Sequence, residues 1–421
     1  MITSRDKPLG LAIIGCGQIA THHLDAIASK LQGKISLRAL CDPSAERRSV
    51  LANLPSSLIL SGNEAGGNPP EQFDALDDLI ANTKFLSSAI DIIFIAVPHD
   101  LHEALALQAL SLDKIVVLEK PLAPTIAACN NLVATSEQLR SNQQQSKTAP
   151  SSSNDNNNTN NGAMLIIAEQ SPYWESVALA RKLIEGGAIG RIVTAAAYYY
   201  ESMRDNITSG SVDKSGGLGW RSSLARAGGG IAIDGGLHWI RPLREMVGRI
   251  EEVVAVTRYG LAPELGMEGE SLGHAIMKIQ SPESDDGPLA QPKGSGCLTA
   301  TYSCNMLSTA PMAHNMCPYF RVTGTKGELV IGGDGLAKEK PGAGGLRLYD
   351  ESSPAGKNML PTDRMGGFFL GFAGLWVEVY RICSERDYSK AHETVIRAAD
   401  DVRTVLAMYK SAETGMWEST Q

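Results

Sequence analysis

Short apolar runs and longer amphipathic segments alternate along the first 170 residues. The apolar runs are continuous, as is typical of strands buried on both faces, and they cover residues 9–14, 35–41, 58–60, 92–97, 115–118 and 164–168. The segments between them repeat apolar residues at helical spacing, at residues 22–31, 45–53, 74–81, 101–110 and 125–139. This alternation predicts right-handed βαβ units and a doubly wound sheet.

Two polar stretches interrupt the pattern. Residues 62–72 are rich in Gly, Pro and Asn and predict a long surface loop. Residues 141–162 are richer still in Asn, Ser and Gln, and such a composition buries too little apolar surface to offset the entropy lost on ordering. We expect a disordered insertion within the first domain at about 141–162; an interdomain linker is the alternative interpretation.

The pattern changes after a helix expected at residues 177–185. Strand-like segments now follow one another with few helices between them, which favours an antiparallel or mixed sheet; they cover residues 192–201, 251–257, 274–280, 297–303 and 319–323. Helices are expected at 369–381 and 393–411. A chain of 421 residues usually forms more than one hydrophobic core, so we predict two domains, at residues 1–170 and 171–421.

The composition narrows the function classes. The net charge is −8 without a strong block of one sign, which argues against a general binder of nucleic acid or anionic membranes. Seven scattered cysteines without a C-x-x-C pair favour reduced thiols over a zinc ribbon or a disulfide framework, and we expect no metal site. We find no secretory signal and no apolar stretch of the roughly 20 residues that span a bilayer. We therefore expect a cytoplasmic protein.

The first apolar run leads into a glycine-rich loop with the pattern G-x-G-x-x-A. Between a strand and a helix, this pattern is typical of dinucleotide-binding sites. The first glycine allows the tight turn, the second lets the backbone approach a pyrophosphate, and the alanine permits close helix packing. The N–H groups at the helix N-terminus attract phosphates. We assign to the cofactor the loop residues Gly15, Gly17, Gln18, Ile19 and Ala20.

An acidic residue, Asp42, ends the second apolar run, 22 residues after Ala20. At this position a carboxylate binds the ribose hydroxyls of NAD and repels the 2′-phosphate of NADP. The alternative is a simple turn at Asp42 and Pro43. Arg47 and Arg48 leave NADP open. We predict that NAD is the cofactor.

Further segments, together with the glycine loop, resemble the Gfo/Idh/MocA family of glucose-fructose oxidoreductases and inositol dehydrogenases. They are I-I-F-I-A-V-P-H at 92–99, E-K-P at 119–121, G-G-G at 228–230, D-G-G-L-H at 234–238 and G-T-K-G at 324–327. The resemblance implies an N-terminal Rossmann domain and a C-terminal α/β domain with an open-faced sheet. It also implies that Lys120 lies at the nicotinamide and the substrate. With it we place at the cofactor Pro98, His99, His102 and Glu119.

The chemistry of alcohol oxidation points to candidate catalytic residues. The hydroxyl proton needs a base, and histidine is well suited to accept it near neutral pH. His238 follows Asp234 by four residues, so the carboxylate can orient the imidazole if a helix begins between them. The alternative is that Asp234 caps a helix and His238 packs beside Trp239; the family resemblance favours the catalytic interpretation. Lys120 can hydrogen-bond the substrate oxygen.

Three residues are weaker candidates for substrate contacts, and one departs from the family pattern. They are Trp174, Trp220 and Arg221; the two aromatic rings can stack on a sugar ring, although clustered aromatic residues more often form a core. Family members often carry an acid where this chain has Arg241. That arginine indicates either an acidic sugar substrate or a surface ion pair, and the ion pair is the more common case.

Together these features predict an NAD(P)-dependent oxidoreductase that transfers hydride between nicotinamide and a sugar-like or polyol-like substrate. An NAD-dependent glycosidase with transient oxidation and a non-catalytic dinucleotide-binding regulator are the alternatives. A regulator needs the glycine loop but neither Lys120 nor His238. We also expect a homo-oligomer, because apolar positions on an open sheet need covering; we assign to that face Ile276, Leu298 and Tyr302.

Overall fold

The computed structural model describes residues 7–62, 68–148, 162–200, 218–261, 263, 266–281, 287–307, 319–332, 345–360 and 367–421. The chain forms two compact units. The first comprises Met1–Ala123, Ala127–Glu169 and Phe372–Ala399, and the second comprises Pro124–Ile126, Gln170–Gly371 and Asp400–Gln421. Residues 372–399, which the sequence pattern placed in the second domain, thus belong to the first unit.

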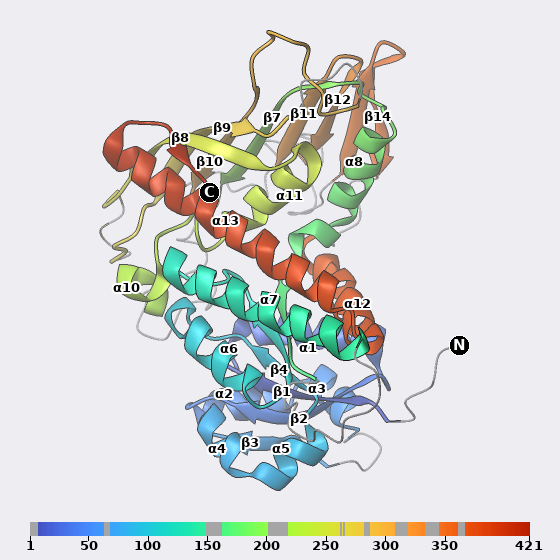
Figure 1. Cartoon of the computed structure of the whole chain (residues 1–421), viewed down its shortest axis with the longest axis vertical. Coiled ribbons are helices and arrows are strands. Elements are labelled where there is room, and N and C mark those ends of the chain that lie inside the picture. Colours follow the sequence, from blue (N-terminus) through green and yellow to red (C-terminus); the bar gives the residue numbers. More distant parts are fainter. Residues whose placement is uncertain are drawn as a thin grey trace. The chain divides into compact units, whose positions relative to one another are not determined.

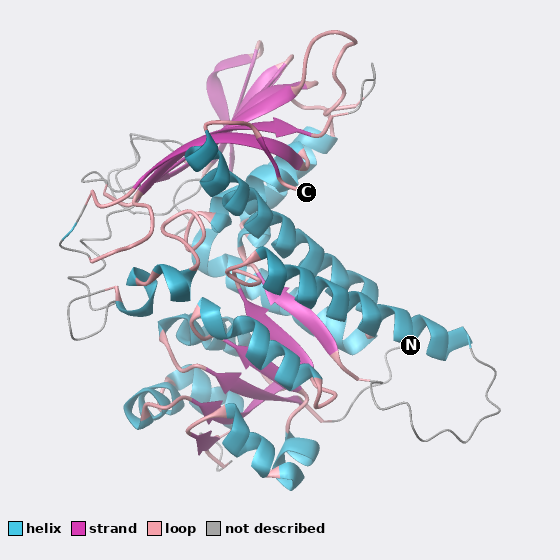
Figure 2. Ribbon diagram, turned by 60° about the vertical axis from the view of Figure 1, so that its left-hand side comes forward, coloured by secondary structure: helices cyan, strands magenta, loops and turns pink. Residues whose placement is uncertain are grey.

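A parallel sheet of six strands forms the centre of the first unit, with helices flanking the strands (Figure 2). The strands lie in the order β3-β2-β1-β4-β5-β6, and every neighbouring pair is parallel. This is the doubly wound order of a Rossmann fold, so the predicted fold class is confirmed. The bounds are β1 Leu9–Ile14, β2 Ile35–Cys41, β3 Glu71–Phe73, β4 Ile92–Ile95, β5 Ile115–Glu119 and β6 Met164–Ala168.

The helices of the first unit follow the predicted pattern apart from two that it did not predict, Pro55–Ser61 and Thr83–Ala89. Residues 58–60, predicted as a strand, lie in helix α3, and the third strand is β3. Pro55 occupies the first turn of α3 and Gly62 ends it in the left-handed conformation, while a run of three apolar residues is too short to reveal a helical period. The helices are α1 Gln18–Leu31, α2 Ala45–Ala52, α3 Pro55–Ser61, α4 Leu76–Ala81, α5 Thr83–Ala89, α6 His102–Leu110 and α7 Ile126–Thr148.

The two polar stretches are shorter than the composition predicted. Residues 141–148 continue helix α7 instead of being disordered, and residues 149–161 lie outside the described part of the chain. In the first stretch, Gly62 ends α3, residues 63–67 are not described, and β3 begins at Glu71. Polar residues on the exposed side of a long helix are compatible with helix formation, which is why composition alone placed the end of α7 too early.

A mixed sheet of nine strands dominates the second unit (Figure 1). Its order is β14-β13-β12-β11-β7-β10-β9-β8-β15, and only the pair β7–β10 is parallel. The strands are β7 Ile192–Tyr200, β8 Ile250–Arg258, β9 Leu272–Ile279, β10 Leu298–Asn305, β11 Phe320–Gly324, β12 Gly327–Ile331, β13 Leu346–Asp350, β14 Ser353–Leu360 and β15 Glu418–Ser419. Further helices are α8 Glu175–Glu185, α10 Leu224–Ala227, α11 Leu237–Val247, α12 Gly367–Glu385 and α13 Tyr388–Thr414.

The two faces of this sheet differ in exposure, and the difference corrects one expectation. Ile276 pairs with Thr301 and is 47% exposed, whereas Tyr302, one residue further along β10, pairs with Ala275 and is 1% exposed. Because side chains alternate between the faces of a strand, Leu298 shares the buried face with Tyr302. Ile276 therefore lies on the open face as expected, while Leu298 and Tyr302 belong to the core.

Two further observations concern the helices and the cysteines of the described residues. Across the ranges given above, no helix combines the length and the apolar character needed to cross a bilayer. The six described cysteines are free thiols, and of these Cys297 is exposed while the others are buried.

Candidate active site

The glycine loop connects β1 to α1. Gly15 has a φ of +95°, and a Cβ there would lie 2.2 Å from the carbonyl oxygen of Ala96. Only glycine is compatible with both the backbone conformation and this close approach. Gly17 precedes the first turn of α1 without a capping side chain, and a Cβ at Gly17 would meet nothing within 4 Å. The loop thus combines open space with uncapped helix N–H groups, an arrangement that fits a pyrophosphate.

Asp42 lies directly after β2 and is joined to this loop. One carboxylate oxygen accepts a hydrogen bond from the Cys16 N–H at 2.9 Å, and the other accepts one from the Ser44 N–H at 2.8 Å. The second bond is the turn that sequence reasoning had set against ribose binding. Each carboxylate oxygen has a further lone pair, so the turn and a ribose contact are compatible at the same side chain.

The two neighbouring arginines differ in their surroundings. Arg48 donates to the backbone oxygen of Asp42 and forms a 2.6 Å ion pair with Asp74, whereas Arg47 is exposed. Arg48 is therefore committed to contacts within the protein.

Lys120 follows β5, and a buried hydrogen-bond chain ends at its backbone. Trp376 Nε1–H donates to His23 Nδ1 at 2.8 Å, His23 Nε2 lies 2.7 Å from Glu119 Oε1, and the Lys120 N–H donates to Glu119 Oε2 at 3.0 Å. An indole nitrogen can only donate, so His23 carries its proton on Nε2 and donates it to Glu119. His23 and Trp376 are fully buried and Glu119 is 5% exposed.

Of the two histidines predicted at the cofactor site, His102 has both ring nitrogens next to backbone oxygens. His102 is fully buried, with Nδ1 2.7 Å from the Pro121 oxygen and Nε2 3.0 Å from the Val97 oxygen. Burial lowers the pKa of His102. Its imidazole thus connects the segment that follows β4 with the segment that follows β5. Val97 directly precedes Pro98, and Pro121 directly follows Lys120. His99 is 2% exposed, and its ring lies 5.6 Å from that of His102.

In the second unit, the candidate residues lie in and around the loop before α11. Arg221 Nε donates to Asp234 Oδ2 at 2.7 Å, and the Arg221 guanidinium lies 4.4 Å from the centre of the Trp220 ring. His238 lies in the first turn of α11 and is 8% exposed. Trp174 is 5% exposed and packs edge-on against Trp239 at 5.5 Å. Trp174 is thus a core residue, whereas Trp220 is partly accessible.

Two glycines let this loop approach the sheet closely. A Cβ on Gly235 would lie 2.1 Å from the Tyr199 hydroxyl, and a Cβ on Gly236 would lie 2.1 Å from the Tyr302 hydroxyl. Gly235 and Gly236, which lie between Asp234 and His238 in the sequence, are therefore required by packing.

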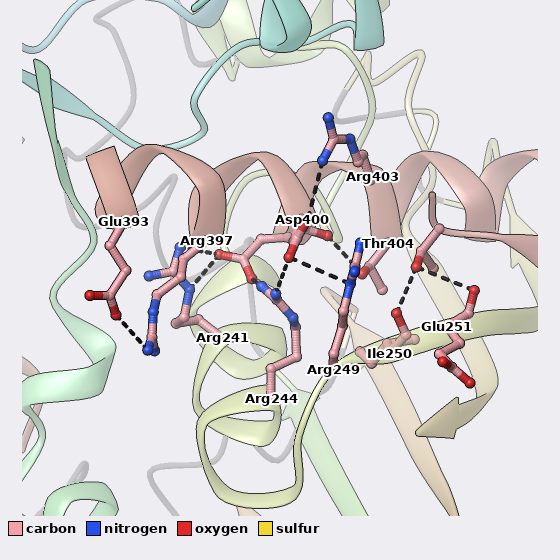
Figure 3. Close-up of polar contacts among 12 residues, drawn as sticks. Arg241, Arg244, Arg249, Ile250, Glu251, Glu393, Arg397, Asp400, Arg403 and Thr404 are labelled. Atoms are coloured by element: carbon pink, nitrogen blue, oxygen red, sulfur yellow. Dashed lines mark hydrogen bonds and ion pairs between the residues drawn. The ribbon is translucent and has the colours of Figure 1, made fainter. Parts of the chain in front are cut away.

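Arg241 forms a buried ion pair rather than the surface pair considered from the sequence. Figure 3 shows the cluster that it shares with the C-terminal helix. Arg241 Nη2 lies 2.6 Å from Asp401 Oδ2, and both side chains are at most 6% exposed. Arg244 pairs with both Asp400 and Asp401. The charge of Arg241 is thus balanced within the protein, and this position gives no support for an acidic substrate.

Sequence reasoning missed three residues around the site: His23, Trp376 and Glu270. His23 follows the glycine loop but belongs to no motif that indicates a role for it. Glu270 is fully buried and contacts the loop that contains Asp234. Within the described ranges, no group of three or more His, Cys, Asp or Glu side chains is arranged to hold a metal ion.

Comparison with known proteins identifies both units. The model "Oxidoreductase family, NAD-binding Rossmann fold" matches residues 9–143, and the model "GFO/IDH/MocA C-terminal domain" matches residues 177–330. Inositol 2-dehydrogenase of Corynebacterium glutamicum (strain R) is 27% identical over 134 residues, which are 32% of this chain and 34% of that protein. Levoglucosan dehydrogenase of Pseudarthrobacter phenanthrenivorans is 27% identical over 200 residues, 48% of this chain and 43% of that protein.

These matches span less than half of the length of either curated relative. A solved structure of levoglucosan dehydrogenase in complex with NADH has a TM-score of 0.70 to this chain at 17% identity, and the match covers 99% of this chain and 100% of that one. At this identity the likeness shows a common fold.

Proposed function

Because the chain belongs to the Gfo/Idh/MocA oxidoreductase family and its first unit is an NAD-binding Rossmann fold, we propose that it transfers hydride between NAD and a CH–OH group of a sugar or polyol. The observation that carries this proposal is the glycine loop, where Gly17 leaves open space at the uncapped N-terminus of α1. The names of the relatives, an inositol and a levoglucosan dehydrogenase, support the substrate class.

We propose that Lys120 of the first unit and His238 of the second both act at the reacting oxygen. NAD, when bound, would supply the hydride acceptor, so the task of the protein's own residues is to remove the hydroxyl proton. His238 is the proposed base, and the Lys120 ammonium stabilises the developing negative charge on the oxygen. Asp234 orients His238 in this proposal, and its ion pair with Arg221 fixes the direction of the carboxylate. Trp220 and Arg221 are the proposed sugar contacts.

NAD is the proposed cofactor in preference to NADP. Asp42 is 6% exposed, and its carboxylate accepts a hydrogen bond from the N–H of Cys16 in the glycine loop. A 2′-phosphate beside this carboxylate would meet a like charge. Pro98 and His99 complete the proposed cofactor set. His102 and Glu119 hold the backbone of this set in place through their hydrogen bonds to Pro121 and Lys120.

We further propose a homo-oligomer that covers the open face of the second-unit sheet. Val256 and Ile276 are 61% and 47% exposed there, and Val256 pairs with His274 in the same outward register as Ile276. Apolar side chains gathered on one sheet face favour self-association. The free thiols suit a reducing compartment, and we propose the cytoplasm. Light scattering at micromolar concentration tests the assembly, and a monomer would count against it.

A substrate screen tests the proposed activity. Polyols including inositol, aldoses, levoglucosan, uronates and dihydrodiols are each incubated with NAD, and the absorbance of NADH is followed. We expect NADH formation with at least one polyol or sugar and less with NADP in place of NAD. Turnover of a glycoside without net NADH would instead indicate an NAD-dependent glycosidase, and cofactor binding without any turnover would indicate a regulator.

A further inference from the structure

Glu270 is a fully buried carboxylate in the second unit, held by neutral donors. Its Oε2 accepts a hydrogen bond from the Gly230 N–H at 2.6 Å, and its Oε1 accepts bonds from the Ala232 N–H at 2.8 Å and the Tyr409 hydroxyl at 3.0 Å. Among the described residues, the partners of its carboxylate are these donors, and none of them is a lysine, arginine or histidine. A buried carboxylate without a cation is costly, so its position between these donors calls for a functional explanation.

Backbone bonds connect Glu270 to the start of α11. The Ile231 N–H donates to the Glu270 carbonyl oxygen at 3.1 Å, so three consecutive N–H groups, from Gly230 to Ala232, bind this one residue. The Asp234 N–H then donates to the Gly230 oxygen at 3.3 Å, and the Gly236 N–H donates to the Ile231 oxygen at 2.8 Å. Gly236 directly precedes α11, which contains His238.

The packing around Glu270 leaves the loop little freedom. A Cβ on Gly229 would lie 2.2 Å from the Tyr409 hydroxyl, and a Cβ on Gly230 would lie 2.0 Å from the Glu270 carbonyl oxygen. A Cβ on Gly269 would lie 2.6 Å from the Gly229 carbonyl oxygen. The two backbones are therefore in direct contact, and the carboxylate fixes how one lies on the other.

We propose that Glu270 is a positioning residue, whose ionised carboxylate holds the loop from Gly230 to Gly236 and thereby sets the orientation of Asp234 and His238. This inference rests on the proposed role of His238 as the base. A misplacement of about 1 Å at a reacting group can cost about 100-fold in rate, so a support of this kind acts on turnover although Glu270 touches no substrate.

The ionisation of Glu270 gives the proposal a specific signature. Burial raises the pKa of Glu270 to about 7, while the hydrogen bonds from Ala232, Tyr409 and Gly230 lower it. The titratable groups that face it are Tyr409 of α13 and Tyr302 and Cys304 of β10, and burial raises the pKa of all three. These three groups are therefore neutral in this range, and Glu270 changes charge near neutral pH.

The test compares pH profiles of turnover for the wild type, Glu270→Gln, Tyr409→Phe and Ser411→Ala. Ser411 is the matched control, because it is buried on α13 two residues from Tyr409 but bonds Ala255 and Met416. In the wild type, protonation of Glu270 should lower turnover in addition to protonation of the proposed base, so turnover should fall more steeply on the acid side than in Glu270→Gln. Glu270→Gln should lower turnover at neutral pH about 10- to 100-fold and make the acid limb shallower.

Tyr409→Phe supplies a milder variant, should Glu270→Gln fail to fold. It removes a hydrogen bond that lowers the pKa of Glu270, so the acid limb should move to higher pH, while Ser411→Ala should leave it in place. An acid limb that is unchanged in both Glu270→Gln and Tyr409→Phe would overturn the proposal. The assay uses the fastest compound of the substrate screen.

His238→Ala separates this inference from the proposed function. If His238→Ala keeps near-normal turnover, the proposed function fails. If His238→Ala is slow while Glu270→Gln has the wild-type rate and profile, only the positioning role fails. If the proposed function and the positioning role both hold, the variant that combines His238→Ala with Glu270→Gln should be no slower than His238→Ala alone, because Glu270 acts through His238.

Hydrogen exchange of the loop provides a readout that needs no substrate. Because the hydrogen bonds from Gly230 and Ala232 lower the pKa of Glu270, its ionisation strengthens them. Local openings that leave Glu270 buried should therefore become rarer, and these two amides should exchange more slowly as Glu270 ionises, after correction for the intrinsic exchange rate. In Glu270→Gln this protection should be lost. Equal protection in both proteins would contradict the role of the carboxylate.

Discussion

Two buried carboxylates, one in each unit, bind the segments that lead to the two side chains that we propose act on the substrate, and they are held in different ways. Glu119 receives one N–H from the His23 ring and one from the backbone of Lys120. Glu270 receives two backbone N–H groups of the loop and the Tyr409 hydroxyl. The first support therefore depends on side chains from distant parts of the chain, whereas the second depends mainly on backbone geometry.

The largest expected effect is a loss of turnover on substitution of either reacting side chain, and the accompanying change in NAD affinity distinguishes the two. His238→Ala should reduce turnover by about 10²- to 10⁴-fold, because it removes the proposed base, and should leave NAD affinity almost unchanged. Lys120→Ala should lower turnover and also weaken NAD binding, because the E-K-P segment is proposed to contact the cofactor. Steady-state kinetics and NADH fluorescence titration measure both quantities. Near-normal turnover of His238→Ala would make Tyr198, Tyr199 or Tyr200 the next candidates for the base.

Substitution of Asp42 tests the proposed cofactor site of the first unit. Asp42→Ala removes the acceptor for the Cys16 N–H as well as the proposed ribose contact. A hydrogen bond to a charged group contributes about 1.5–3 kcal/mol, so NAD affinity should fall about 10- to 100-fold, and the preference over NADP should shrink. If the wild type binds NADPH more tightly than NADH, the assignment of Asp42 is wrong, and Arg47 becomes the residue to examine.

The side-chain support of Lys120 is tested at His23. His23→Leu leaves Glu119 buried without one of its donors, which should destabilise the protein by about 1–3 kcal/mol and lower turnover severalfold. His23→Gln keeps an N–H group that can reach Glu119, so it should retain more of both. Thermal unfolding and turnover measure the two effects. Equal behaviour of the two variants would show that packing, rather than the hydrogen bond to Glu119, determines the role of His23.

A pH dependence of stability is expected from Glu270. Its pKa is about 7 in the folded protein and 4.5 when solvated, so the folded state binds more protons between these values. Its contribution to stability is therefore complete below about pH 4.5 and is lost as the pH rises to about 7. The free energy of unfolding should fall more steeply with pH in the wild type than in Glu270→Gln. Equal slopes in urea titrations would place the pKa of Glu270 elsewhere.

The two supports also show what a sequence reveals about a site. Glu119 lies in the E-K-P motif, and Gly15, Gly17 and Asp42 follow a spacing with a known physical reason, so these positions were predictable. Glu270 acts through N–H groups that every residue except proline has, and such a contact leaves no pattern of residue types. Trp376 lies 353 residues from His23, and no local periodicity predicts that pairing.

The same distinction applies to the fold. The continuous apolar runs predicted five of the six strands of the first sheet, because strands buried on both faces have that pattern. The short third strand, Glu71–Phe73, has no such run and was missed. In the second unit, the sequence predicts Ile276 and Tyr302 on one face, but Ile276 pairs with Thr301, the neighbour of Tyr302, so the two side chains lie on opposite faces. Strand register is a tertiary property that the separate segments do not contain.

Hydride transfer itself is the central claim, and an isotope experiment tests it most directly. The best substrate of the screen is labelled with deuterium on the carbon that bears the reacting hydroxyl, and both the reduced dinucleotide and the product are analysed by mass spectrometry. The account predicts that deuterium appears in the dinucleotide, in equal amount to the oxidised product, and that His238→Ala slows its appearance without diverting it. Product that forms with no net reduced dinucleotide, or a dinucleotide that remains unlabelled, would contradict the account.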